Sequence, residues 1–190
     1  MARRVLGTVR PRIIALTIVL AAGSLSVGAA EPKMPNCSGL ASVPTSGLKE
    51  VQELRQRVST GPFFKELVRR KGETSSCRVE VNGSNITLIF TFGRKASLEA
   101  RANASIEYFQ QRMQLQGLDR PQAIKLLKKN EEDAFGAQGC GINWQQPSEE
   151  SPGSEPDAWE VVYRGDTCNC QGRLVYSGNA LVALVSSSAC

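Results

Sequence analysis

The sequence predicts an α+β fold, in which an antiparallel sheet packs against two N-terminal helices and one later helix in a small domain stabilised by disulfides. Three observations support this class. Apolar residues recur at helical spacing early in the chain and again after residue 119. Runs of β-branched and aromatic residues alternate with turn-forming residues, and six cysteines follow an export signal.

The first thirty residues have the features of a secretory signal peptide. Four arginines precede a 10-residue apolar run at 13–22, and a stretch of small residues follows up to Ala30. The apolar run is shorter than the ~20 residues that a membrane-spanning helix needs. We therefore expect cleavage after Ala30, a secreted or periplasmic location, and no membrane span in the mature chain.

The net charge of +5 belongs mostly to this predicted leader. Removing its four arginines from the 23 basic residues leaves 19 against 18 acidic residues, a balance that gives no reason to expect a nucleic-acid partner. Two local basic clusters remain, at residues 69–71 and at Lys125, Lys128 and Lys129. Both are expected to be solvated helix faces or favourable helix C-termini.

Residues 31–190 have a length that suits one domain. A first helix is predicted over residues 46–58, with Ser46 as its N-cap. A second helix is predicted from Pro62 to just before Gly72.

Strands are expected in the middle of the chain. The runs at residues 77–81 and 86–92 flank an Asn-Gly turn and predict a hairpin. Residues 97–116 fit both a strand and a helix, but alternation over six steps favours strand, with a turn near residues 103–105.

A third helix is predicted between Asp119, as its N-cap, and Gly136. Residues 145–158 are polar and rich in Ser, Pro, Glu and Gly, so a flexible surface loop is expected there. Three strands should follow, the last two joined by a turn at residues 177–179. Their predicted bounds are residues 159–164, 173–176 and 180–185.

Six cysteines in an oxidising compartment predict three disulfides, for which fifteen connectivities exist. Pairing Ser177 with Ala180 in the last hairpin sets residue 190 opposite residue 167, beside Cys168. Two cysteines that are two residues apart in a strand point to the same face and do not easily bond to each other. The predicted pairs are therefore Cys168 with Cys190, Cys170 with Cys140, and Cys37 with Cys77.

A soft-metal site is the alternative interpretation of the C-terminal cysteines. Thiolates of Cys168, Cys170 and Cys190, with Met34 as a further ligand, have suitable chemistry. Export makes free thiolates hard to maintain, so the disulfide interpretation is preferred and no metal or cofactor is assigned.

The chain contains no histidine, which excludes Ser-His-Asp and Cys-His catalysis and histidine-ligated zinc. Ser46 and Lys49 form a Ser-x-x-Lys pattern, and Ser177 and Asn179 form the Ser-x-Asn that accompanies it in penicillin-recognising enzymes. No Lys-Thr-Gly is present, and a helix cap at Ser46 explains the first pattern without catalysis.

Paired carboxylates remain possible catalytic groups, because glycoside cleavage needs two acids and no histidine. The candidates are Glu80, Glu99, Glu107, Glu160 and Asp166, and no spacing selects two of them. Four aromatic residues offer a second type of site, a patch for sugars or peptides: Tyr108, Trp144, Trp159 and Tyr163. Asn-x-Ser/Thr patterns begin at Asn36, Asn82, Asn85 and Asn103.

These observations favour a non-catalytic binding protein, an inhibitor or accessory subunit whose partner is a protein or other macromolecule of the cell envelope or the extracellular space. A small scaffold held by disulfides, without histidine or a recognisable site, suits a binder better than an enzyme. A small carbohydrate- or peptidoglycan-active hydrolase that uses two carboxylates is the alternative. No residue is assigned a catalytic role.

Overall fold

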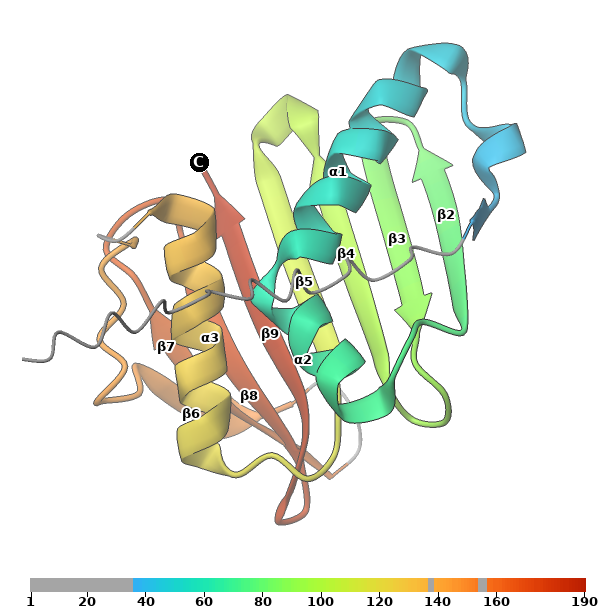
Figure 1. The fold of residues 1–190 in the computed structure, drawn as a ribbon. Helices are drawn as coiled ribbons and strands as arrows, with labels where there is room; N and C mark the ends of the chain where they lie inside the picture. Colours follow the sequence, from blue (N-terminus) through green and yellow to red (C-terminus); the bar gives the residue numbers. More distant parts are fainter. Residues whose placement is uncertain (1–35, 137–138, 154–156) are drawn as a thin grey trace, which may run out of the picture. The chain divides into compact units, whose positions relative to one another are not determined.

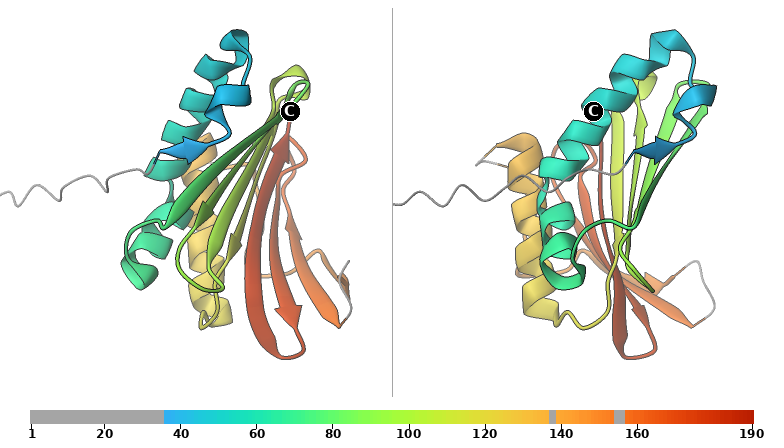
Figure 2. Two further views of the ribbon diagram at one scale, coloured as in Figure 1. Left: turned by 90° about the vertical axis from the view of Figure 1, so that its right-hand side faces the viewer. Right: turned by 45° about the vertical axis from the view of Figure 1, so that its right-hand side comes forward.

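The computed structural model describes residues 36–136, 139–153 and 157–190, which form a nine-stranded sheet with three α-helices on one face (Figures 1 and 2). The α+β class predicted from the sequence is confirmed. The sheet is mixed instead of purely antiparallel, because β1 runs parallel to β2. The predicted signal peptide, its cleavage site and Met34 lie outside the described residues.

The strand order is β1-β2-β3-β4-β5-β9-β8-β7-β6, so two antiparallel meanders meet where β5 pairs with β9. The strands of the first half are β1 (Cys37–Ser38), β2 (Ser76–Asn82), β3 (Asn85–Thr91), β4 (Ser97–Asn103) and β5 (Tyr108–Gln114). Those of the second half are β6 (Glu149–Pro152), β7 (Ala158–Arg164), β8 (Gln171–Ser177) and β9 (Ala180–Ala189).

The three predicted helices are α1 (Leu48–Thr60), α2 (Pro62–Lys71) and α3 (Arg120–Phe135). Asp119 caps α3 as expected: its Oδ1 accepts a hydrogen bond of 2.8 Å from the backbone N–H of Gln122. The expectation that Ser46 caps α1 is wrong. Ser46 lies in a short 3₁₀ helix, and the N-cap is Gly47, which provides no side-chain cap.

The ambiguous segment at residues 97–116 consists of two strands, as the alternation predicted. β4 and β5 are joined by a single 3₁₀ turn (Ala104–Ile106) and pair antiparallel. Leu98 lies opposite Met113, and both are fully buried under the helices. The period-two pattern prevails here because one face of the hairpin covers the core while the other does not.

The segment expected to be a surface loop contains strand β6. Glu149 pairs with Val162, so β6 adds an edge strand to β7. Its four residues carry no apolar alternation, which is why the sequence shows no strand signal there.

The main core lies between the sheet and the helices. The ring of Phe64 on α2 lies 5.3 Å from the rings of Phe90 and Phe92, each in an edge-on arrangement. None of the described helices is long and apolar enough to cross a membrane.

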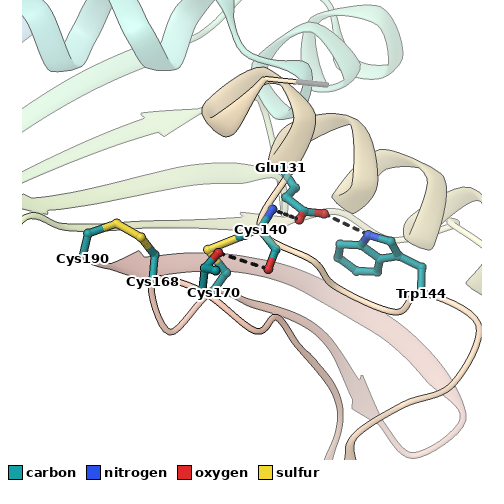
Figure 3. The surroundings of a disulfide bond; sticks show 7 residues. Glu131, Cys140, Trp144, Cys168, Cys170 and Cys190 are labelled. Carbon is teal, nitrogen blue, oxygen red and sulfur yellow. Dashed lines mark hydrogen bonds between the residues drawn. A yellow bond between two sulfur atoms is a disulfide. The ribbon is translucent and has the colours of Figure 1, made fainter. Parts of the chain in front are cut away.

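Three disulfides join distant parts of the chain: Cys37–Cys77, Cys140–Cys170 and Cys168–Cys190. The first connects β1 to β2. The second connects the loop after α3 to the start of β8, and the third connects the β7–β8 turn to the end of β9 (Figure 3). Such bonds are consistent with an oxidising compartment.

Cys168 and Cys170 lie in the tight turn between β7 and β8. The expectation that they share one face of a strand is therefore wrong. The backbone N–H of Cys170 donates to the carbonyl of Thr167 at 3.2 Å, and the residues between them, Cys168 and Asn169, have φ of 52° and 44°. Left-handed values at both central positions are those of a type I′ turn, which suits the twist of a hairpin.

A bulge also changes the register of the last hairpin. Ser177 pairs with Ala180 as expected, but the register shifts by one residue between Val175 and Tyr176. Continuing the shifted register places Cys190 opposite Cys168 itself, in agreement with the bond of 2.8 Å from the N–H of Ala189 to the carbonyl of Cys168.

Candidate functional site

The sheet has one face covered by α1, α2 and α3, and an opposite face on which no described helix lies; we call the latter the open face (Figure 2). Side chains on this face follow the strand register in rows. One row runs from β2 to β9 through Glu80, Thr87, Arg101, Gln110 and Ser187. In β2 to β5 the alternation presents mainly polar side chains on this face and mainly apolar side chains to the helices, whereas β7, β8 and β9 also carry aliphatic side chains on the open face.

A hollow of about 420 Å³ lies on the open face, near the junction of the two meanders. In the register, Val185 of β9 lies between Arg112 of β5 and Arg173 of β8. Val185 is only 2% exposed and forms an aliphatic floor between the two arginines. The complete lining consists of Glu99, Arg101, Gln110, Arg112, Gln114, Glu160, Arg173 and Val185.

The floor extends beyond the hollow as a small second core. Val175, Ala183 and Val185 form a buried cluster that is separate from the main core. Val162, on the neighbouring β7, is buried as well. Arg173 lies between Val162 and Val185 in the register, and alkyl stems of arginine cover apolar surface well. Between β7 and β9 the open face thus has polar side chains over an aliphatic layer.

Each of four carboxylates on the open face forms an ion pair with an arginine of the same face. The pairs are Arg78–Glu80 at 3.1 Å, Arg173–Glu160 at 3.2 Å, Arg164–Glu149 at 2.8 Å, and Arg101–Glu99. The hydrogen bond from Arg164, followed by its charge, lowers the pKa of Glu149 from its ordinary value. Because these charges are paired, a partner would recognise the positions of the hydrogen-bond donors and acceptors on this face more than its net charge.

The structure brings three of the five candidate carboxylates onto this face, and Glu99 and Glu160 line the same hollow. Their strands, β4 and β7, are four strand spacings apart, or about 19 Å along the sheet. That spacing is wide for a pair of catalytic acids, which lie roughly 5–10 Å apart. Glu107 lies in a turn before β5, and Asp166 packs beside Gly141 in the loop after α3.

The four candidate aromatic residues do not form one exposed patch. Trp144 and Tyr163 lie together on the helix side of the sheet, with ring centroids 5.4 Å apart, and Tyr163 is 1% exposed. Trp159, near the β6 edge of the sheet, is 41% exposed, and Tyr108 lies at the start of β5. Two of the four therefore contribute to the core.

A row of asparagines was not recognised in the sequence. Asn82, Asn85 and Asn103 are consecutive partners across β2, β3 and β4, and Tyr108 continues the row on β5. The side-chain N–H of Asn103 donates to the side-chain oxygen of Asn85 at 2.8 Å. Asn82, Asn85 and Tyr108 line a second hollow of about 370 Å³, which extends the polar surface of the open face. The row could have been predicted by pairing the residues of the β2–β3, β3–β4 and β4–β5 hairpins in register.

The main hollow is harder to find from sequence. Its β5 residues and its β8 and β9 residues are brought together only by the pairing of β5 with β9, which joins segments about 70 residues apart. The roles of Arg112, Arg173 and Val185 consequently have no local sequence signal.

A buried carboxylate, Glu131, stabilises the region of the second disulfide (Figure 3). Its Oε1 accepts a bond of 2.6 Å from the N–H of Cys140, and its Oε2 accepts one of 2.9 Å from the indole N–H of Trp144. Glu131 is 6% exposed, so both bonds lie away from water. The arrangement holds the loop after α3 against the helix.

The remaining sequence patterns take structural positions. All six cysteines are oxidised to disulfides, so the thiolates of the soft-metal alternative are absent. Within the described part of the chain, no three His, Cys, Asp or Glu residues are grouped as metal ligands. Ser46 lies in the 3₁₀ helix before α1, Lys49 lies in the first turn of α1, and residues 177–179 form the β8–β9 turn.

Comparisons with protein-family models, with curated protein sequences and with solved structures found no match to this chain.

Proposed function

We propose that this chain is a non-catalytic binding protein, an inhibitor or accessory subunit, that uses the open face of its sheet to bind a macromolecule of the cell envelope or the extracellular space. The observation that carries the proposal is the open face itself: a sheet surface without a covering helix among the described residues, with a hollow floored by Val185 and walled by Arg112 and Arg173. Arginine beside buried aliphatic surface is typical of energetically important interface positions.

The dimensions of the face suit a protein-sized partner. The seven strands from β2 to β7 in the sheet order give a width of about 29 Å, and seven-residue strands give a length of about 20 Å. A surface of that extent is of the same order as the ~800 Å² that each partner buries in a standard interface.

The face also needs little ordering on binding. Its side chains project from paired strands; one disulfide joins β1 to β2 at one end of the sheet order, and another joins the β7–β8 turn to the end of β9. A preorganised surface loses less conformational entropy when a partner binds. This rigidity favours a binding role.

A bulky residue placed in the hollow tests the proposal. Gln110→Trp fills the hollow without breaking an ion pair, and Gln52→Trp, on an exposed position of α1, is the matched control. The oxidised mature protein and both variants would be used to capture partners from the cell envelope, followed by calorimetry with the recovered protein. The control should bind like the wild type, and Gln110→Trp should weaken binding at least tenfold, a loss of about 1.4 kcal/mol. Equal binding by both variants, or no stoichiometric partner, would contradict the proposal.

The two-carboxylate hydrolase remains a second candidate because Glu99 and Glu160 line one hollow. Their strand separation and their arginine partners argue against an acid pair. Release of soluble fragments from peptidoglycan or glycans by the wild type, and its loss in Glu160→Gln, would favour the hydrolase. No release by the wild type would remove this candidate for those substrates.

A further inference from the structure

A groove of about 410 Å³ lies between α2 and α3, on the helix-covered side of the sheet. Each helix contributes residues at positions i, i+3, i+4 and i+7, which form one stripe along a helix. On α2 the stripe begins at Pro62 and ends at Arg69; on α3 it begins at Gln122 and ends at Lys129. Basic residues that are separate in sequence therefore line one groove: Arg69 and Arg70 on α2, and Lys125 and Lys129 on α3.

The groove has an excess of positive charge. Among the described residues that line it, Glu66 is the one carboxylate, and it is engaged by Arg69 at 2.7 Å and by Arg70 at 2.7 Å. Lys65, Lys125 and Lys129 are exposed and form no ion pair within the described part of the chain. Three lysines are thus available to an anionic ligand.

The floor of the groove is apolar and its walls are connected. Pro62, Leu118 and Leu126 supply aliphatic surface between the cations. Arg70 reaches from α2 to the start of α3, where its Nη1 donates to the carbonyl of Gly117 at 3.0 Å and its Nη2 to Gln122 at 3.2 Å. These bonds hold the two helices together, so the groove is formed before any ligand binds.

We propose that this groove binds a short acidic protein segment in which an apolar side chain lies between carboxylates. The apolar side chain would contact Leu118 and Leu126, and the carboxylates would pair with the lysines on both walls. From Gln122 to Lys129 the helix rises about 10 Å, the length of two helical turns or about three extended residues. The site is independent of the open face, from which the sheet separates it.

A protein segment fits this groove better than an anionic membrane. A helix surface that binds a bilayer presents apolar side chains that project into the lipid. The exposed large hydrophobic residues of the described chain are Ile106, Phe135 and Trp159, and none of them lines the groove. Its apolar atoms are recessed between cations, which suits a ligand that enters the groove.

The test uses the disulfide-bonded protein and a fluorescent 12-residue peptide of Asp and Glu with two central leucines, in an anisotropy titration at low salt. The groove variant Lys65→Gln/Lys125→Gln/Lys129→Gln is compared with a control of equal charge, Lys49→Gln/Lys71→Gln/Lys128→Gln. Lys49 and Lys128 pair with acids of their own helices, and Lys71 does not line the groove. We expect the groove variant to bind about tenfold more weakly and the control to stay within twofold of the wild type, with binding weakened by salt.

Further arms identify what the groove recognises. A peptide with Asn and Gln in place of the acids, and one with Ser in place of the leucines, should each bind more weakly than the parent. Equal loss in both lysine variants, no binding by the wild type, or no effect of the leucines would overturn the proposal. So would groove-dependent binding to phosphatidylglycerol vesicles without binding to the peptide. Because the open face is unchanged in these variants, loss of peptide binding with retained capture of the envelope partner separates the two sites.

Discussion

Glu131 shows how a single residue holds a part of the fold that apolar packing alone does not. It is buried, it belongs to α3, and its two oxygens accept hydrogen bonds from two points in the following loop. Removing the carboxylate leaves two buried donors without acceptors. We expect Glu131→Ala to lower the free energy of unfolding by about 2–4 kcal/mol, measured in urea. Glu132→Ala, which loses only an exposed pair with Lys128, should change it by less than about 0.5 kcal/mol.

Glu66 gives the unfolding free energy a pH dependence of known sign. The hydrogen bond from Arg69, the largest cause, and that from Arg70 lower the pKa of Glu66 from its ordinary value, and burial opposes them. A folded-state pKa below the unfolded one contributes stability above about pH 4, which is lost as the pH falls through the folded pKa. Glu66→Gln should therefore cost stability at pH 7 and converge toward the wild type near pH 2 in thermal unfolding. A constant difference across that range would contradict this assignment.

Gly172 leaves the space that the indole ring of Trp144 occupies. A Cβ at this position would lie 2.3 Å from the indole Cη2 and 2.6 Å from Cζ3, so something has to move. We expect Gly172→Ala to lower the unfolding free energy by about 1–3 kcal/mol. In a double-mutant cycle with Trp144→Phe, which shortens the ring, the combined loss should be smaller than the sum of the single losses. Additive losses would show that the two residues do not compete for this space.

At the scale of the element, the turn between β7 and β8 depends on two left-handed residues. Asn169, at φ 44°, is of a type that tolerates this region, whereas a β-branched residue does not. Asn169→Val should lower the unfolding free energy by about 1–2 kcal/mol, and Asn169→Gly should leave it unchanged or slightly raised. Urea unfolding of the oxidised proteins measures both. If the two variants have the same unfolding free energy, the left-handed conformation of residue 169 does not determine the stability of this turn.

The sequence predicts elements with clear local signals and misses those without them. The hairpin of β2 and β3 follows from Asn82-Gly83, and the cap of α3 follows from Asp119, because both depend on neighbouring residues. β6 has no alternation of its own and forms because the edge of β7 is available to it. The register of the last hairpin was one residue off because a bulge near Val175 carries no clear sequence signal.

The candidate site was predicted even less completely than the fold. Hairpin alternation places Glu80, Glu99 and Glu160 on strand surfaces, but only the pairing of β5 with β9 shows which surfaces adjoin. The basic groove also depends on contacts between distant segments. The sequence predicts Arg69 and Lys125 only as solvated residues of two helices, and the packing of α2 against α3 brings them to one groove. Long-range pairing of this kind is not encoded in any short window.

For the whole molecule, the disulfides should contribute comparably to stability. Cys37–Cys77 closes a separation of 40 residues and Cys168–Cys190 one of 22, and loop-closure entropy varies only slowly with length. Replacing either pair by serine should lower the unfolding free energy by about 3–4 kcal/mol. Urea unfolding of Cys37→Ser/Cys77→Ser and Cys168→Ser/Cys190→Ser under non-reducing conditions measures the two losses. A loss below about 1 kcal/mol for either pair would mean that its loop is already constrained by other contacts.

The position of β9 has a consequence for the order of assembly. This strand follows all the others along the chain, yet it lies between β5 and β8 in the sheet. As the chain emerges during synthesis, β5 has an unpaired edge until β9 arrives, and unpaired edges invite aggregation. The two halves can join only when the whole described chain has emerged, so any factor that shields the nascent chain would need to act on the edge of β5 until then.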